Sequence, residues 1–546
     1  MRAAPLHFFA IAFLWAACPA ASAQVVYVDD TAVGANDGTS WQNAFTDLQP
    51  ALALAGPSGV VWVARGTYRP SQTLDRSARF TVRGAVFGGF DGTETTIADR
   101  AGLFDETILT GDLLGNDGPG FTGYGDNSEN VVYFGPVDIP VLDGFTVRGG
   151  NSSARGGGLL IEYFSFGATV RHCTFVANHA AGQGGGIDCS FTEADTFIDR
   201  CTFLGNRTRG DGGGVSGSLS TYLRSCRFLG NSAEGQGGGL EFAWTAVDCL
   251  FSGNTAAGRG GGASYTDTVV NCTFSGNRAA LGGGMSGAWP WAPSEIRNSV
   301  FWGNADDAGT GQSGQVAGAV IVDESVVQAW DGSLAGTGTF DADPLFRSPL
   351  GADGRAGTLD DDLRLEAGSP CIDTAPLLGY VGILVDALGR PRLVDSLLCD
   401  GGGKLDRGAL ERGEVDGTTV YCESTSSSTG APAEIGGPCR ADPAGGALAI
   451  VAQPVPAGRA FLLLGNPGAP HPFGDGNLCL AGALRRTAPV APSGGSVVFH
   501  LDPNSPPGSD VLLPGATVGL QVLFRDTAAG GTGFNLSSAM RLLVVP

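Results

Sequence analysis

Six copies of the motif Phe-x-x-Asn stand between Phe175 and Asn304, at intervals of 23 to 28 residues. They read FVAN, FLGN, FLGN, FSGN, FSGN and FWGN, and a Gly-Gly-Gly triplet lies beside each one. Five copies have a cysteine two residues before the phenylalanine, and the sixth has Ser299 there. A repeat of this length is one supersecondary unit, which must stack on its neighbours to bury a core. The chain is therefore predicted to form a solenoid.

Each repeat has the pattern of short strands separated by bends. Cysteine and phenylalanine at positions i and i+2 lie on one face of a strand. The apolar residue three before the cysteine has the wrong parity for that strand, so a bend must fall between the two. No part of the repeat shows a period of 3.6 residues. Successive turns then pair in parallel at roughly 4.8 Å, and the crossover rule gives the hand. The sequence predicts an all-β chain built on a right-handed parallel β-helix.

Stacked turns place equivalent residues above one another. The asparagines of the six motifs are therefore predicted to form a ladder at one bend: Asn178, Asn206, Asn231, Asn254, Asn277 and Asn304. Side-chain amides can bond to backbone groups that a turn leaves unpaired. We interpret this ladder as structural, with ligand binding as the alternative. The phenylalanines are expected to form an internal stack.

The alternation of Gly-Gly-Gly-apolar with Cys-x-Phe-x-x-Asn resembles the GGA[IL]/FxxN repeats of the polymorphic outer-membrane protein family. It also resembles the wider pectate-lyase-like superfamily of right-handed β-helices. The opening VYVDDTAVGANDGTSWQNAFTDLQPAL and the later SPCID, LGRPR and DRGALE are similar to the first and closing segments of large secreted bacterial β-helix repeat proteins. The resemblance covers about residues 25–415. It implies the β-helix fold, and it leaves both adhesion and polysaccharide cleavage open as activities.

Composition and segment boundaries point to an exported chain of two parts. The net charge is −22 and Lys404 is the only lysine, which argues against nucleic acid as a partner because phosphate binding needs basic surface. Residues 1–23 have the pattern of a secretory signal peptide. We expect the β-helix over 24–415, with the repeats over about 150–304 and irregular closing turns with a cap over about 316–415. Short β-type runs over 421–546 predict a small β-sandwich-like domain.

The cysteines of the repeat are expected to be buried and reduced, because they face the interior with the phenylalanines. They are Cys173, Cys201, Cys226, Cys249 and Cys272. Export favours disulfides elsewhere in the chain. The best candidate is Cys422 with Cys439, and the second is Cys371 with Cys399.

An acidic loop after the repeats reads DGRAGTLDDD. Its carboxylates, around glycine, are of the type that Ca²⁺ prefers, but the spacing is not that of an EF-hand. The candidate ligands are Asp353, Asp360, Asp361 and Asp362. A solvated acidic loop is the alternative. No cofactor other than calcium is indicated.

The length of the repeat varies only between the glycine triplet and the next cysteine, which predicts a functional face on that side of the solenoid. The stretches are 187–200, 215–225, 240–248, 263–271 and 285–298. They carry four candidate ligand-binding aromatics, Tyr222, Trp244, Tyr265 and Trp289, for which packing between turns is the alternative.

No catalytic constellation is recognisable in the sequence. The aspartates of the repeats share no register and are interpreted as solvated, and His172 is interpreted as exposed. We expect a secreted or cell-surface protein, without enzymatic activity, that binds extracellular glycan or protein in an adhesion or envelope role. The alternative is an extracellular polysaccharide lyase, glycoside hydrolase or esterase. A purely structural envelope component is a third possibility.

Overall fold

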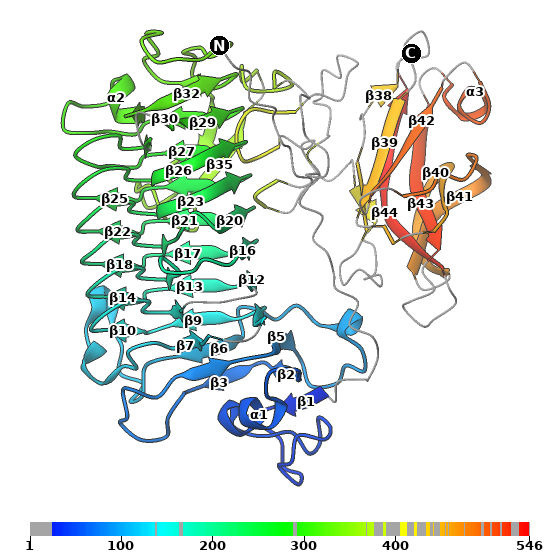
Figure 1. The fold of residues 1–546 in the computed structure, drawn as a ribbon. Helices are drawn as coiled ribbons and strands as arrows, with labels where there is room; N and C mark the ends of the chain where they lie inside the picture. Colours follow the sequence, from blue (N-terminus) through cyan, green and yellow to red (C-terminus); the bar gives the residue numbers. More distant parts are fainter. Residues whose placement is uncertain are drawn as a thin grey trace.

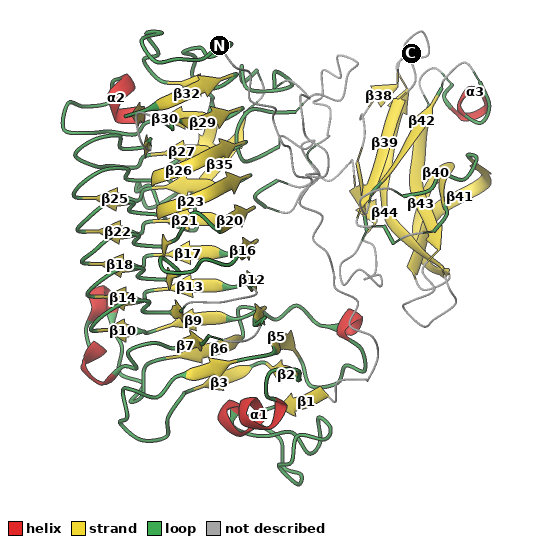
Figure 2. Cartoon of the chain, in the orientation of Figure 1, coloured by secondary structure: helices red, strands yellow, loops and turns green. Residues whose placement is uncertain are grey.

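The computed structural model describes residues 25–546 apart from 137–138, 163–166, 288–291, 367, 376–385, 389–391, 393–404, 412–419, 423–432, 437–439, 442–447, 454, 457, 474–475, 493–495, 503–504, 514–515, 526–533 and 545–546. Figure 1 shows a stack of coils followed by a separate β-rich unit. Figure 2 shows that strands and loops make up nearly all of it, so the all-β class is confirmed. The predicted signal peptide and Trp289 lie outside the described residues.

Three parallel sheets run along the stack of coils. We call the largest sheet A; its strands are β1 (Val25–Val28), β2 (Val60–Ala64), β4 (Phe80–Val82), β5 (Ala85–Phe90), β7 (Val132–Phe134), β8 (Val141–Asp143), β11 (Leu159–Ile161), β12 (Ala168–Arg171), β15 (Ile187–Asp188), β16 (Thr196–Asp199), β19 (Val215–Ser216), β20 (Thr221–Arg224), β23 (Leu240–Val247), β26 (Ala263–Val270), β28 (Met285–Ser286), β29 (Ser294–Arg297), β31 (Val316–Ala317) and β32 (Val320–Asp323).

Sheet B contains β3 (Gly66–Tyr68), β6 (Thr107–Thr110), β9 (Thr146–Arg148), β13 (Thr174–Val176), β17 (Thr202–Leu204), β21 (Arg227–Leu229), β24 (Leu250–Ser252), β27 (Thr273–Ser275), β30 (Val300–Trp302) and β33 (Val326–Val327). Sheet C contains β10 (Asn151–Ser152), β14 (His179–Ala180), β18 (Arg207–Thr208), β22 (Ser232–Ala233) and β25 (Thr255–Ala256). Each repeat passes through sheets B, C and A in that order, and each strand pairs with the equivalent strand of the next turn. The strand pairing therefore confirms a parallel β-helix.

The phenylalanines of the motif form a continuous stack inside the solenoid. Phe175 pairs with Phe203 and Phe203 with Phe228 in sheet B, and the register continues to Phe301. Neighbouring ring centroids are 4.4 to 5.3 Å apart, and the rings are nearly parallel. All six side chains are fully buried. In-register stacking thus turns one sequence motif into the core of the molecule.

The bend before each cysteine is made by a residue in the left-handed conformation. His172, Arg200 and Asp248 have φ of 50°, 52° and 54°, and the equivalent residues of the other turns are similar. The interpretation of this position as exposed was wrong, because Asp248 is completely buried and His172 is only partly exposed. At this bend His172 and Asp248 make ionic contacts, and Ser225, Asn271 and Asn298 are buried.

The six asparagines lie one above another at the bend between sheets B and C, and all are buried. Asn206 Nδ2 donates to Asn231 Oδ1 at 2.9 Å and to the Phe175 carbonyl at 2.8 Å. Asn231 Oδ1 also accepts from the Asn206 backbone N–H at 3.0 Å. At the end of the run, Gln315 Oε1 takes the place of the next asparagine. The side chains thereby satisfy backbone groups that the bend leaves unpaired.

Two features stabilise the ends and turns of the stack. Helix α1 (Leu48–Ala55) begins after Asp47, whose side chain accepts from the Gln49 N–H at 2.9 Å, and its residues Leu48 and Leu52 are buried in the core of the first turns.

The middle glycine of each triplet approaches the next turn closely. A Cβ at Gly213 would stand 2.3 Å from the Gly238 carbonyl oxygen, so no larger residue fits there.

The closing segment turns back along the outside of sheet B. It includes β34 (Phe346–Ser348), which pairs with β35 (Asp362–Leu365) in antiparallel fashion. Leu363 packs against Leu229 and Leu250 of the solenoid. Arg392 lies 3.3 Å from Asp248, and neither side chain is exposed. The segment therefore covers the outer face of the later turns.

Among the described cysteines, some are free thiols and one is disulfide-bonded. Those of the repeat are free and buried, as is Cys371, so its pairing with Cys399 was wrong. Cys371 packs beside Val300 and Val326 under the closing segment. Cys479 is disulfide-bonded. The pairing of Cys422 with Cys439 stays a prediction, because Cys439 lies outside the described residues.

The C-terminal unit has two mainly antiparallel sheets with a common core. One contains β36 (Val420–Cys422), β38 (Arg440–Ala441), β40 (Ala460–Phe473), β41 (Gly476–Arg486), β43 (Thr517–Arg525) and β44 (Phe534–Val544). The other contains β37 (Glu434–Gly436), β39 (Leu448–Gln453) and β42 (Val497–Leu501). Ile450 and Phe499 of the second sheet pack with Leu462 and Val522 of the first. Two sheets sharing one core have the arrangement of a sandwich.

Candidate functional site

The repeats differ in length where sheet A passes from one strand of a turn to the next. The connection is 189–195 between β15 and β16, 217–220 between β19 and β20, and 287–293 between β28 and β29. β23 and β26 run through without a break. The variable stretches of the sequence therefore run through sheet A, and they supply both buried core residues and the residues of its outer face. Several of these residues lie on strands rather than on loops.

Aromatic side chains stack in pairs on this face. Phe197 and Tyr222 are register partners, with ring centroids 5.3 Å apart and an interplanar angle of 25°. Phe242 and Tyr265 lie 5.6 Å apart at 32°, and both have positive φ (59° and 52°). Trp244 of β23 is 44% exposed. We call these five residues the aromatic strip.

Three of the four aromatics predicted from the sequence thus belong to one face of sheet A. Phe197 and Phe242 were not among the residues predicted, although the sequence holds a signal for Phe197. Phe197 stands at the same distance before Cys201 as Tyr222 before Cys226, so alignment on the cysteines would have paired them.

A column of polar residues follows the glycine triplets at the edge of the same sheet. Asp188, Ser216 and Glu241 are register partners on successive turns. Ser216 Oγ donates to Glu241 Oε2 at 3.0 Å, and Arg155 Nη1 lies 2.9 Å from Asp188 Oδ2. Asp188 is completely buried and Glu241 is 8% exposed. The interpretation of the repeat aspartates as solvated was therefore wrong for Asp188, and also for Asp199 and Asp248, which are buried.

Burial changes the proton affinity of both acids in this column. It raises the pKa of Asp188 to about 6, against the opposing effects of Ser190 and Arg155. It raises the pKa of Glu241 to about 7, against the hydrogen bond from Ser216. A carboxyl group that keeps its proton to near-neutral pH can act as a general acid, and Glu241, the more exposed of the two, is the candidate.

Other acids at the bends are held in ion pairs. Asp143 contacts Arg100 at 2.8 Å, His172 Nδ1 at 3.1 Å, and Arg171. Burial acts to raise the pKa of Asp143, but the hydrogen bond with His172 and the two arginines outweigh it and hold the pKa well below its usual range. Arg224 binds Asp199 through two nitrogens, at 2.8 and 3.0 Å. These carboxylates are already paired, so their role in the structure is to hold adjacent turns together.

The acidic loop uses its carboxylates for its own backbone and for the solenoid. Asp360 accepts from the Ala352 N–H at 2.6 Å, and Asp361 accepts from Ser252 Oγ at 2.8 Å. Asp362 is paired with Arg364, and Asp353 accepts from the loop backbone. Among the described residues, no group of three or more His, Cys, Asp or Glu side chains is placed to hold a metal ion. Calcium at this loop stays a prediction.

The stacked turns and parallel pairing define the class of this protein as a β-helix solenoid. No known family's sequence profile matches the chain, and no curated protein sequence matches it. Among solved structures, it is similar to the crystal structure of pectate lyase Pel9A, with a TM-score of 0.34 and 14% identity over 71% of this chain and 96% of that one. In the part of the chain that the structure describes, no helix is both long and apolar enough to span a membrane.

Proposed function

We propose that this protein is exported and binds a neutral extracellular glycan chain along the outer face of sheet A, in an adhesion or envelope role. The observation that carries the proposal is the aromatic strip, in which the pair Phe197–Tyr222 and the pair Phe242–Tyr265 lie on neighbouring turns beside the exposed Trp244. Export is proposed from the signal-peptide pattern of residues 1–23.

The geometry of the strip suits a polymer better than a compact ligand. Aromatic faces carry partial negative charge and attract the C–H groups on the flat side of a sugar ring. The two pairs occupy four successive turns, but Phe242 stands three residues before Thr245, the register partner of Tyr222. The strip therefore crosses the turns obliquely, and consecutive units of an extended chain can each contact a ring. Strands hold these rings in place, which reduces the entropy lost on binding.

The charge of the face favours a neutral glycan. Asp195 lies close enough to Tyr222 to help burial raise the pKa of that phenol. Burial and the charge of Glu295 raise the pKa of Asp267 on β26. A polyanionic chain would meet this negative charge at the strip and be repelled.

The Asp188–Glu241 column favours one second candidate, a polysaccharide hydrolase or lyase. A protonated Glu241 could act as a general acid, and Asp188 lies on the same edge of the sheet. The purified protein on a glycan array, run beside an assay for reducing ends and unsaturated products, tests both candidates. Retention of a neutral glycan without cleavage supports the first. Product formation that Glu241→Gln abolishes supports the second. If the protein neither retains nor cleaves a glycan, the proposal has no support.

A further inference from the structure

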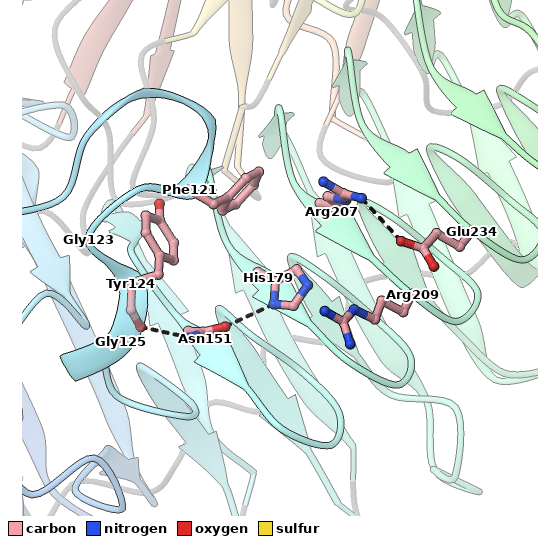
Figure 3. Close-up of a pocket in the computed structure, with 9 residues that line it drawn as sticks. All are labelled: Phe121, Gly123, Tyr124, Gly125, Asn151, His179, Arg207, Arg209 and Glu234. Atoms are coloured by element: carbon pink, nitrogen blue, oxygen red, sulfur yellow. Dashed lines mark hydrogen bonds and ion pairs between the residues drawn. The ribbon is translucent and has the colours of Figure 1, made fainter.

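A pocket of about 430 Å³ opens over the first strands of sheet C. Loop residues 121–125 form one wall, and side chains of β14, β18 and the turn after β22 form the other (Figure 3). None of the residues lining it belongs to sheet A. It is therefore separate from the aromatic strip.

The loop wall is held in an unusual conformation. Phe121 has a φ of 64°, which is rare for a bulky residue and is retained where the surroundings impose it. Its ring lies 5.0 Å from that of Tyr124 and 5.9 Å from the imidazole of His179. The Tyr124 hydroxyl donates to the Ala177 carbonyl at 2.6 Å, which anchors the loop to the solenoid. The result is an apolar wall facing an imidazole.

The hydrogen bonds around His179 determine which nitrogen is available. Asn151 Nδ2 donates to the Tyr124 carbonyl at 2.8 Å, so Asn151 Oδ1 is left as an acceptor. That oxygen lies 2.9 Å from His179 Nδ1, which must then carry the proton. Burial and the charges of Arg209 and Arg207 lower the pKa of His179, so the ring is neutral near pH 7. Nε2 is therefore left as a hydrogen-bond acceptor.

The far wall carries an excess of positive charge. Arg207 pairs with Glu234 at 3.1 Å, and both side chains are about half exposed, so this pair contributes little energy and can rearrange. Figure 3 shows the Arg209 guanidinium directed toward His179, with no interaction drawn to the other labelled residues. An arginine fork in this position matches the oxygens of a carboxylate or sulfate group.

We propose that this pocket binds a sugar unit carrying one carboxylate or sulfate group. Arg209 receives the anionic group, because Arg207 is paired with Glu234 whereas the Arg209 guanidinium makes no hydrogen bond or ion pair with the other residues that line the pocket. His179 Nε2 and Glu234 accept hydrogen bonds from ring hydroxyls, and Phe121 contacts the flat apolar side of the ring. The combination of a cation, two acceptors and an aromatic wall fits a hydroxylated anion better than a simple inorganic ion or a neutral sugar.

Titration calorimetry of the full chain with glucuronate, glucose 6-sulfate and glucose tests the proposal. We expect at least one of the two anions to bind and glucose to bind at least about tenfold more weakly, the loss that removal of one charge-assisted contact produces. Binding of glucuronate alone or of the sulfate alone would identify the source of the charge. Equal binding of all three, or no binding of either anion at millimolar concentration, would overturn the proposal.

Two variants keep the test specific. Arg209→Gln is expected to weaken binding of the anion at least about tenfold without shifting the melting temperature, because the side chain is exposed. Arg278→Gln is the matched control, since Arg278 is exposed on the same register as Arg207 but outside the pocket. Equal affinity of Arg209→Gln and the control would contradict the proposal. The aromatic strip is intact in both variants, so binding of the neutral glycan is expected to be unchanged.

Discussion

Asn231 Nδ2 donates to Asn254 Oδ1 at 2.9 Å, and the same oxygen accepts the Asn231 backbone N–H at 3.0 Å. One buried side chain therefore satisfies two donors of the turn before it. Asn254 in turn donates to the Phe228 carbonyl at 2.9 Å. Each link of the ladder joins neighbouring turns, so loss of a single asparagine leaves groups unpaired on both sides.

Replacement of Asn254 by alanine is expected to lower the free energy of unfolding by about 1–3 kcal/mol, because buried donors and an acceptor lose their partners. Thermal or urea unfolding measures the change. Asn116→Ala, at an exposed loop position, serves as the control and should unfold like the wild type. Identical unfolding of the two variants would show that the ladder contributes no stability.

The four thiols Cys201, Cys226, Cys249 and Cys272 are expected to resist alkylation in the native protein. All are free and no more than 1% exposed, and burial raises the pKa of Cys201 and Cys249, which keeps these thiols protonated and unreactive. Mass spectrometry after alkylation with and without denaturant checks this. Rapid labelling without denaturant would be inconsistent with the stacked core.

Stability is expected to depend on pH through Glu241. The unfolded chain releases this proton near the ordinary pKa of 4.5, whereas the folded chain retains it to about 7. Between these values the folded state binds more protons, so stability falls as pH rises and the loss is complete above about pH 7.

Glu241→Gln should therefore be more stable than the wild type at about pH 8, by roughly 1–3 kcal/mol, and should show no such gain at about pH 4. Urea unfolding at both pH values measures this. Glu366→Gln, at an exposed position, is the control. A gain that is the same at both pH values would refute the assignment of the effect to this proton.

The contact between Arg392 and Asp248 is expected to hold the closing segment against sheet B. Arg392→Met removes one partner of a fully buried pair and should cost about 3–5 kcal/mol of stability. Adding Asp248→Asn should restore part of the loss, since the unpaired charge is then removed. A double-mutant cycle measures the coupling. Additive losses would mean that the two side chains do not stabilise each other.

The fold was predictable because the spacing of residues within each repeat indicates where its strands and bends lie. Phe175 and its equivalents stack as expected, and the bend that the parity of the repeat predicts is made by His172 and its equivalents with positive φ. The sequence could not show which segment returns to cover the solenoid. Asp248 was interpreted as solvated because Arg392, which buries it, is distant in the chain and has no repeat pattern.

The candidate sites were harder to predict for the same reason. Tyr222 and Tyr265 were identified from the variable stretches, but their stacking on Phe197 and Phe242 depends on register across turns. The pocket over sheet C brings the loop residue Phe121 to His179, a contact that no local pattern encodes.

The most direct test of the proposed function is the affinity of a variant in which Tyr222, Trp244 and Tyr265 are all replaced by alanine, measured against a neutral glycan that the wild type retains on an array. The control variant replaces Val33, Leu54 and Leu114, which are exposed apolar residues away from sheet A. We predict that the aromatic variant loses at least about tenfold in affinity, while its circular dichroism and melting temperature stay close to those of the wild type. Wild-type affinity in the aromatic variant would contradict the account.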